Sequence, residues 1–382
     1  MAEQPPRRGS RPDWSSGLPE PELLESMGMR VASGHDAVSF RSVCSPWRAA
    51  IPFKSFAPLL LFPFGPESES VTFYSVSEEK TISFPLPDDM RGKVPCGASR
   101  GWLALMDEAA SVTLFNPFTG RRVELPPADE HIAAASFETR VSKVDRRWIL
   151  HPDEDPSRVI NIDEMRDVFF REIALSAPPY PGRECLAMAV LPNSTMVALC
   201  KVGVDSAWTL LDTNLECFVK SNVHCQKKIY AIDIIGNISI CNCNDAGGPP
   251  TATPVPSLSA PEDVCHRSYM EANGELYLVG FLGGFNENFG GPSVSKYKEN
   301  SVYLSGPSYP SQITVLRYEI INIANHTWQM VTVLEKMEQP CALCWFRPNV
   351  WMGGGFSSSK PDEEKSSKEA EPSKIKGSPE PA

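Results

Sequence analysis

The sequence has no apolar run that approaches the roughly 20 residues of a membrane-spanning helix, and its mean hydropathy is −0.22. It also lacks a basic excess, because 36 Lys and Arg stand against 47 Asp and Glu, a formal net charge of −11. A surface that neutralises phosphates needs that excess, so we expect no nucleic-acid partner. Residues 1–10 are polar with no apolar stretch behind them, unlike a signal peptide. We therefore expect no membrane partner and a cytoplasmic and/or nuclear location.

Long helices should be few, because proline makes up 36 of the 382 residues and each proline removes a backbone donor and resists a helix interior. The 11 cysteines are an odd number spread through a long chain. They predict reduced and mostly buried thiols rather than a disulfide framework.

The cysteine spacing of a structural zinc site is also missing. Cys341 and Cys344 are separated by two residues, but only one residue lies between Cys241 and Cys243. About 100 residues separate the two pairs, which is not the pattern of a zinc-binding unit. Chance proximity of core thiols is the favoured interpretation, and we expect no metal and no cofactor.

One catalytic pattern is present, since residues 97–101 match the G-x-S-x-G nucleophile elbow of serine hydrolases, with Ser99 at its centre. That elbow needs a buried strand before it and a helix after it. Residues 85–95 are rich in Pro and Asp, which predicts no core strand there, and a strand-like segment follows. His224 and His266 could serve a triad, but alternating strands and helices are absent. Hydrolysis by Ser99 is a remote alternative, and we expect no catalytic residue.

The chain divides by composition into four parts. Residues 1–12 form a polar arm and residues 357–382 a Ser-, Lys-, Glu- and Pro-rich tail, both predicted to be disordered. Residues 13–52 are predicted to be helical, and residues 56–350 alternate short apolar runs with turn residues, as strands do. The predicted fold class is therefore α+β and multidomain, with a small all-α segment followed by an all-β domain.

The helical segment has apolar faces that are large for its size. Leu23, Leu24, Met27 and Val31 fall on one helical face, and residues 33–36 are predicted to form a turn with Asp36 as an N-cap. After that turn, an apolar stripe recurs at helical spacing in Phe40, Val43, Cys44 and Trp47. Such short helices cannot build a large core alone. Either a partner shares this apolar surface, or the helices cap the larger domain.

The order of residues in this segment resembles an F-box. Leu-Pro at residues 18–19, Leu-Leu at 23–24 and Phe-Arg-Ser-Val-Cys-Ser-Pro-Trp-Arg at 40–48 follow the pattern of that family, while Met27 and Val31 replace its more usual Ile and Leu. The resemblance implies docking on a Skp-type adaptor, and through it on a cullin–RING ubiquitin ligase. The residues to which it gives this adaptor-binding role are Leu18, Pro19, Leu23, Leu24, Val43, Cys44 and Trp47, with Arg41 and Arg48 at the rim.

The middle of the chain repeats a unit of strand, turn and strand. Examples are residues 71–76 with 81–87, residues 101–105 with 112–120, and residues 228–233 with 238–241. Many short strands at regular spacing predict a sandwich, a barrel or a propeller. The length of the region and a unit of roughly 40 to 50 residues favour a propeller.

The same region resembles the plant F-box proteins that carry the domain of unknown function 295, a KIB-type β-propeller. The similarity lies in residues 97–103, in Asn-Pro-Phe-Thr-Gly at 116–120 with Leu-Pro-Pro at 125–127, and in the hairpin of residues 228–241. It extends over residues 13–335. The sequence after that departs from the family pattern, which leaves open whether the last blade is complete.

Taken together, these features predict a non-catalytic adaptor of an SCF-type ubiquitin ligase, whose propeller binds a protein client. A propeller that acts as a scaffold or inhibitor outside any ligase is the alternative. The sequence does not name the client.

Overall fold

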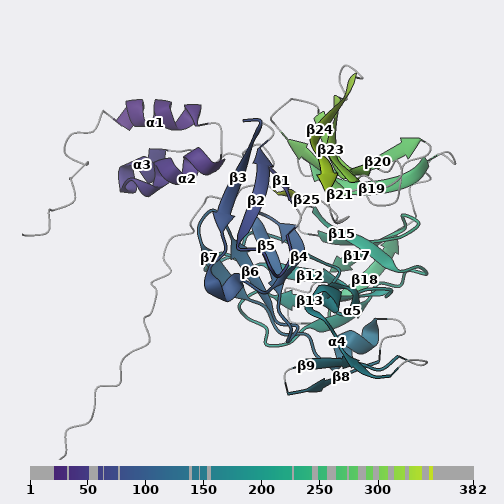
Figure 1. Cartoon of the computed structure of the whole chain (residues 1–382). Coiled ribbons are helices and arrows are strands. Elements are labelled where there is room, and N and C mark those ends of the chain that lie inside the picture. The colour runs from purple at the N-terminus through teal and green to yellow at the C-terminus, as the bar shows by residue number, and fades with distance from the viewer. Residues whose placement is uncertain are drawn as a thin grey trace, which may run out of the picture.

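The computed structural model describes residues 21–255 except 32–33, 51–58, 63, 76–77, 137–139, 146, 153–155, 226–227 and 243–247, together with the later strands named below. Three short helices come first, followed by strands (Figure 1). They are α1 (Pro21–Arg30), α2 (Gly34–Ser42) and α3 (Ser45–Ala50). Because α2 already begins at Gly34, Asp36 lies in its first turn, and the predicted turn with Asp36 as N-cap is wrong.

The strands of the described part form six sheets that we number as blades, plus one extra sheet. Blade one contains β1 (Leu59–Leu61), β2 (Ser70–Ser75), β3 (Lys80–Pro85) and β25 (Cys344–Phe346), and blade two contains β4 (Val94–Ser99), β5 (Trp102–Met106), β6 (Val112–Asn116) and β7 (Arg121–Glu124). Blade three contains β11 (Glu172–Leu175), β12 (Leu186–Val190), β13 (Met196–Lys201) and β14 (Thr209–Asp212), and blade four β15 (Val219–Cys225), β16 (Lys228–Asp233), β17 (Ile238–Asn242) and β18 (Thr251–Val255). Blade five contains β19 (Val264–Ala272) and β20 (Glu275–Leu282), and blade six β21 (Gly290–Ser295), β22 (Ser301–Ser308), β23 (Thr314–Asn322) and β24 (Thr327–Met337).

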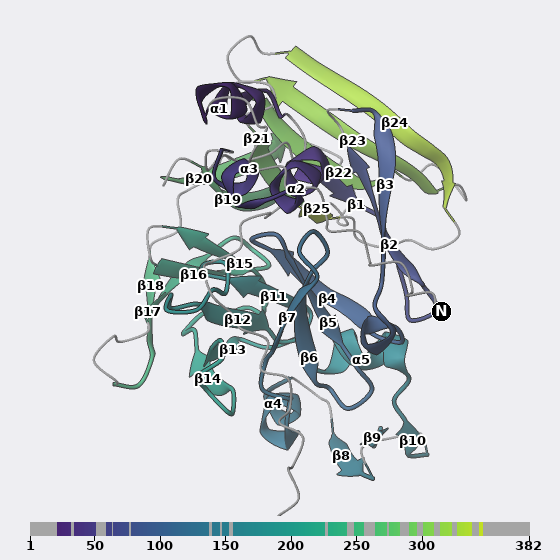
Figure 2. The same cartoon turned by 90° about the vertical axis from the view of Figure 1, so that its left-hand side faces the viewer.

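The blades follow one another around a ring. Neighbouring blades meet through one edge strand each, in the order β25, β4, β11, β15, β19, β21 and back to β25. Figure 2 shows the sheets in this succession, with the three helices over one side of the ring. The expected mostly-β, propeller-like domain with short N-terminal helices is therefore confirmed.

Strand β25, which follows the last blade in the chain, belongs to blade one. It pairs antiparallel with β1, so that Leu59 lies opposite Phe346 and Leu61 opposite Cys344. A strand from near the end of the chain thus completes the first blade, and within the described strands the ring is continuous. This pairing covers a strand edge that would otherwise offer its backbone groups to other chains.

The structure differs from the sequence-based expectations at three further places. The segment before Ser99 is a strand, because β4 is the ring-facing strand of blade two in spite of Pro95. The glycine-rich, polar sequence of residues 283–312 is typical of a long loop, yet β21 and β22 lie within it. The small sheet of β8 (Val141–Val144), β9 (Arg147–Leu150) and β10 (Arg158–Val159) was not predicted, and it is not one of the six ring blades.

This extra sheet is attached to the ring through helices and aromatic side chains. Contacts join α4 (Glu130–Ala135) to β8, and α5 (Met165–Val168) to β4. Trp148 of β9 packs on Phe169 with ring centroids 4.7 Å apart, and both side chains are fully buried. The short helices η1 (Asp88–Met90) and η2 (Ile162–Glu164) complete the described elements. None of the described helices is long and apolar enough to cross a membrane.

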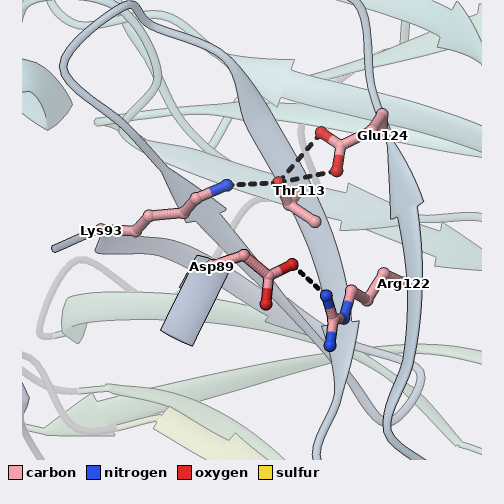
Figure 3. A network of polar contacts seen from close by, with 5 residues as sticks. All are labelled: Asp89, Lys93, Thr113, Arg122 and Glu124. Atoms are coloured by element: carbon pink, nitrogen blue, oxygen red, sulfur yellow. Dashed lines mark hydrogen bonds and ion pairs between the residues drawn. The ribbon is translucent and has the colours of Figure 1, made fainter. Parts of the chain in front are cut away.

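A polar network fixes the passage from blade one to blade two (Figure 3). The Lys93 ammonium donates to the Thr113 hydroxyl at 2.6 Å, and this hydroxyl donates to the Glu124 carboxylate at 3.0–3.1 Å. Beside it, Arg122 of β7 pairs with Asp89 of η1. The connection between the blades is thereby tied to strands β6 and β7.

Candidate functional site

The helical segment is held together by a small buried interface. Leu24 is only 4% exposed, and Gly28, one turn later, is also buried. Helix α3 contacts both α1 and α2. Ala37 of α2 is completely buried and belongs to the same apolar cluster as Leu59 and Phe73 of blade one. The helices are therefore joined both to one another and to the propeller.

The joint between α2 and α3 divides the stripe that the sequence placed on one helical face. Helix α2 ends at Ser42 and α3 begins at Ser45. Arg41 donates from Nη1 to the Arg48 carbonyl at 2.8 Å, while Arg48 donates from Nε to the Arg41 carbonyl at 3.3 Å. The Phe40 and Trp47 rings close the joint, with centroids 4.3 Å apart. These contacts hold the two short helices at a fixed turn.

Arg41 lies inside this joint rather than at an exposed rim. Its side chain is buried, and burial followed by the nearby charge of Arg48 lowers its pKa, whereas Tyr180 raises it. Arg41 is thus buried whereas Arg48 is exposed, and a rim contact with an adaptor stays a prediction for both residues.

The other predicted adaptor-binding residues differ in how far their side chains are exposed to solvent. Leu23 is 52% exposed and Val43 is 46% exposed, so both present apolar surface to solvent. Leu24 is buried, whereas Cys44 and Trp47 are half-buried. Leu18 and Pro19 lie outside the described residues.

Helix α1 also exposes two methionines that the sequence argument did not include among the site residues. Met27 lies one helical turn after Leu23, and Met29 is 64% exposed. We call Leu23, Met27, Met29 and Val43 the exposed apolar set. Helical spacing could have indicated Met27, since it shares a face with Leu23. What the arrangement can do is bind apolar surface of another protein, as amphipathic helices do.

Ser99 stands in a different setting from that of a hydrolase nucleophile. It ends β4, and β5 begins after a two-residue turn and pairs antiparallel with β4, so no helix follows. Its hydroxyl accepts a hydrogen bond from the Leu175 amide at 3.0 Å. The neighbouring Arg100 donates to the Leu175 carbonyl and also lies 3.2 Å from Nδ1 of His224. The motif thus joins blades two, three and four, and it lacks the geometry of an elbow.

Five of the described cysteines behave as core residues, whereas Cys44 and Cys217 are half-buried. Cys96, Cys185, Cys200, Cys225 and Cys241 are all buried. Burial raises the pKa of the Cys185 thiol to about 11 and of the Cys96 and Cys200 thiols to about 12, which disfavours the reactive thiolate. Within the described residues no three His, Cys, Asp or Glu side chains gather as a metal site would require. Cys243 and Cys341 of the zinc hypothesis lie outside those residues.

Relatives of the chain carry F-box names. The Arabidopsis thaliana F-box protein At5g55150 is 25% identical over 275 residues, covering 70% of this chain and 66% of the relative. F-box protein At2g26160 of the same plant is 23% identical, covering 70% of this chain and 75% of the relative. F-box protein SKIP23 is 30% identical over a shorter stretch, 36% of this chain and 35% of the relative. The chain thus spans about two thirds of the length of the first relative.

Solved structures resemble the chain only weakly. Apo AztD from Citrobacter koseri has a TM-score of 0.33 at 8% identity, covering 78% of this chain and 99% of that protein. The WD40 domain of SCAP from fission yeast has a TM-score of 0.32 at 8% identity, covering 75% of this chain and 68% of that domain. Similarity at this level does not indicate a function for the chain. The family profile of the KIB1-4 β-propeller, in contrast, matches residues 73–338, most of the ring described above. The chain therefore belongs to the KIB1-4 β-propeller family.

Proposed function

We propose that the protein is a substrate-recognition adaptor of an SCF-type ubiquitin ligase. In this proposal residues 13–52 are an F-box that docks on a Skp-type adaptor, and the propeller of residues 56–350 binds a protein client. The observation that carries it is the exposed apolar set, which lies on α1 and on the joint between α2 and α3, and α2 is joined to the propeller through the buried Ala37. The F-box names of the Arabidopsis relatives support the same conclusion.

No reacting group of this chain is needed for that role. A ligase acts by holding client lysines near a charged conjugating enzyme, which raises their effective concentration. The adaptor contributes two binding surfaces at a fixed distance. Because Ala37 is buried against blade one, and because the Arg41–Arg48 hydrogen bonds hold α3 on α2, we expect the two surfaces to keep a constant orientation.

The experiment tests the exposed apolar set on the full-length protein with a purified Skp-type adaptor. Leu23→Asp combined with Val43→Asp places two charges in the proposed interface while leaving the buried Leu24 and the Phe40–Trp47 contact intact. We expect calorimetric binding to weaken roughly tenfold or more, as loss of interface anchors does. Trp47→Ala is a poorer probe, because Trp47 also supports the joint between α2 and α3.

The control is Val204→Asp, which adds one charge at an even more exposed valine in the turn after β13. This variant should bind the adaptor as the parent protein does, and all variants should keep the parent's melting temperature. Failure of the parent protein to bind any Skp-type adaptor at micromolar concentration would contradict the proposal. It would favour the alternative of a scaffold or inhibitor outside a ligase.

A further inference from the structure

Blade four ends in an exposed apolar projection. In the turn between β16 and β17, Ile234 is 55% exposed and Ile235 is 54% exposed. Phe218, just before β15, is exposed as well, and its carbonyl accepts a hydrogen bond from the Ile234 amide at 3.1 Å. We call Phe218, Ile234 and Ile235 the blade-four tip.

The turn that carries the two isoleucines is held rigidly. The Asp233 carboxylate is buried, and its Oδ1 accepts hydrogen bonds from the amides of Ile235 at 3.0 Å and Asn237 at 2.8 Å. Its Oδ2 accepts from the Asn237 side chain at 3.0 Å. Gly236 supplies the positive φ of +88° that closes the turn. Asp233, Gly236 and Asn237 supply the hydrogen bonds and the backbone conformation that the turn needs. The turn itself therefore does not require large apolar side chains at positions 234 and 235.

The tip lies on the opposite side of the ring from the helices. Arg100, at the end of β4, reaches Leu175 and His224, which lie at the ends of β11 and β15. Ala37 of α2 belongs to the same apolar cluster as Ala98 and Leu103, which pair at that end of β4 and β5, so the helix belongs to this side. The tip, in contrast, lies where β15 begins, since Val219 pairs with Asp233. A protein bound at the tip would leave the exposed apolar set of the helices accessible.

Size and charge indicate what the tip can bind. Three side chains cannot supply the roughly 800 Å² per partner of a stable folded interface or dimer, so a short peptide segment fits better than a second copy of the chain. Exposed Asp212, at the end of β14, and exposed Glu216 precede Phe218, whereas a single exposed base, Lys220, follows it on β15, and the whole chain has a net charge of −11. Acidic surroundings favour basic flanks on the bound segment. A rigid tip also loses little entropy on binding.

We propose that the blade-four tip anchors a short peptide segment of the client, with large apolar residues between basic flanks. This inference rests on the proposed function for the identity of the client, and it adds where the client binds. The two proposals use different surfaces, so each can fail without the other.

The test selects peptides on the full-length protein from a phage-displayed library of random twelve-residue sequences. We expect enriched sequences to combine two or more large apolar residues with Lys or Arg. Their synthetic peptides should bind Ile234→Ser/Ile235→Ser roughly tenfold or more weakly than the parent protein. Val204→Ser, a matched change at an exposed valine in the turn between β13 and β14, should bind normally.

Two further measurements separate the outcomes. The tip variant should still bind the Skp-type adaptor, and Leu23→Asp/Val43→Asp should still bind the peptides, so that loss at one surface identifies which proposal has failed. Selection that yields no tip-dependent peptide would overturn the inference. So would a concentration-dependent dimer in sedimentation velocity that the tip variant abolishes, because the tip would then bind a second copy.

Discussion

Glu172 shows how a single ring position makes stability depend on pH. It is half-buried on β11, and burial raises the pKa of its carboxyl to about 7, although the charge of Arg166 opposes the rise. The folded protein then keeps a proton that the unfolded chain releases at lower pH. A carboxyl with a raised folded-state pKa therefore costs no stability below its unfolded pKa and an increasing amount as the pH rises towards 7.

We predict that stability falls between pH 5 and pH 8 by an amount on the order of 1–3 kcal/mol, and that Glu172→Gln removes most of this fall. Chemical denaturation at a series of pH values measures it. The control is Glu164→Gln. Hydrogen bonding by Arg158 lowers the pKa of the Glu164 carboxyl, so this group stays ionised between pH 5 and pH 8. The Glu164→Gln variant should therefore show the same fall in stability over this range as the parent protein. Equal slopes for the parent protein and Glu172→Gln would contradict the prediction.

Gly97 is required by a close approach between two blades. A Cβ at this position would lie 2.4 Å from the carbonyl oxygen of Ile173 and 2.9 Å from its amide nitrogen. Both atoms belong to the backbone of β11, so they cannot rotate away as a side chain could. We predict that Gly97→Ala destabilises the protein by about 1–3 kcal/mol, the usual cost of overpacking.

Thermal unfolding measures this effect, with Gly65→Ala as the matched control. A Cβ at Gly65 would meet no atom within 4 Å, so that variant should melt within about 2 °C of the parent protein. If both variants melt alike, blades two and three are not in the close contact described.

At the scale of elements, the blades depend on the connections between them. Thr113 is fully buried on β6, and its hydroxyl bridges Lys93 to Glu124. We predict that Thr113→Val costs about 1 kcal/mol, because it removes hydrogen bonds to two charged groups that can regain water. Thr72→Val is the control, since its hydroxyl meets Ser83 in an exposed pair. Urea unfolding should separate the two variants, and equal midpoints would show that the network contributes nothing.

The helices illustrate how element boundaries change the interpretation of a motif. Periodicity placed Phe40, Val43 and Trp47 on one stripe, and each residue does lie in or beside α2 and α3. The break at residues 43–44 turns Val43 outward, while Phe40 and Trp47 face each other. A helical pattern cannot reveal such a break, because the next turn of sequence continues the same spacing.

At the scale of the whole molecule, closure of the ring depends on β25. We predict that removing residues 341–382 lowers the melting temperature by at least about 5 °C and promotes aggregation, because the edge of β1 loses its partner. Removing only residues 357–382 retains β25 and should change neither property. Thermal unfolding and light scattering measure both. A stable, monodisperse protein without residues 341–382 would contradict the assigned pairing.

The sequence by itself determined the division into helical and strand-rich parts, and it located most strands of blades one to four, such as β2, β6 and β16. Those predictions succeed because apolar alternation and turn residues act over a few neighbouring positions. The tertiary structure alone decided that β25 closes blade one and that β4 and β11 approach at Gly97. It also decided that Ile234 and Ile235 project from the far side of the ring. Pairing between distant segments depends on which surfaces the folded chain brings together, and no local pattern encodes it.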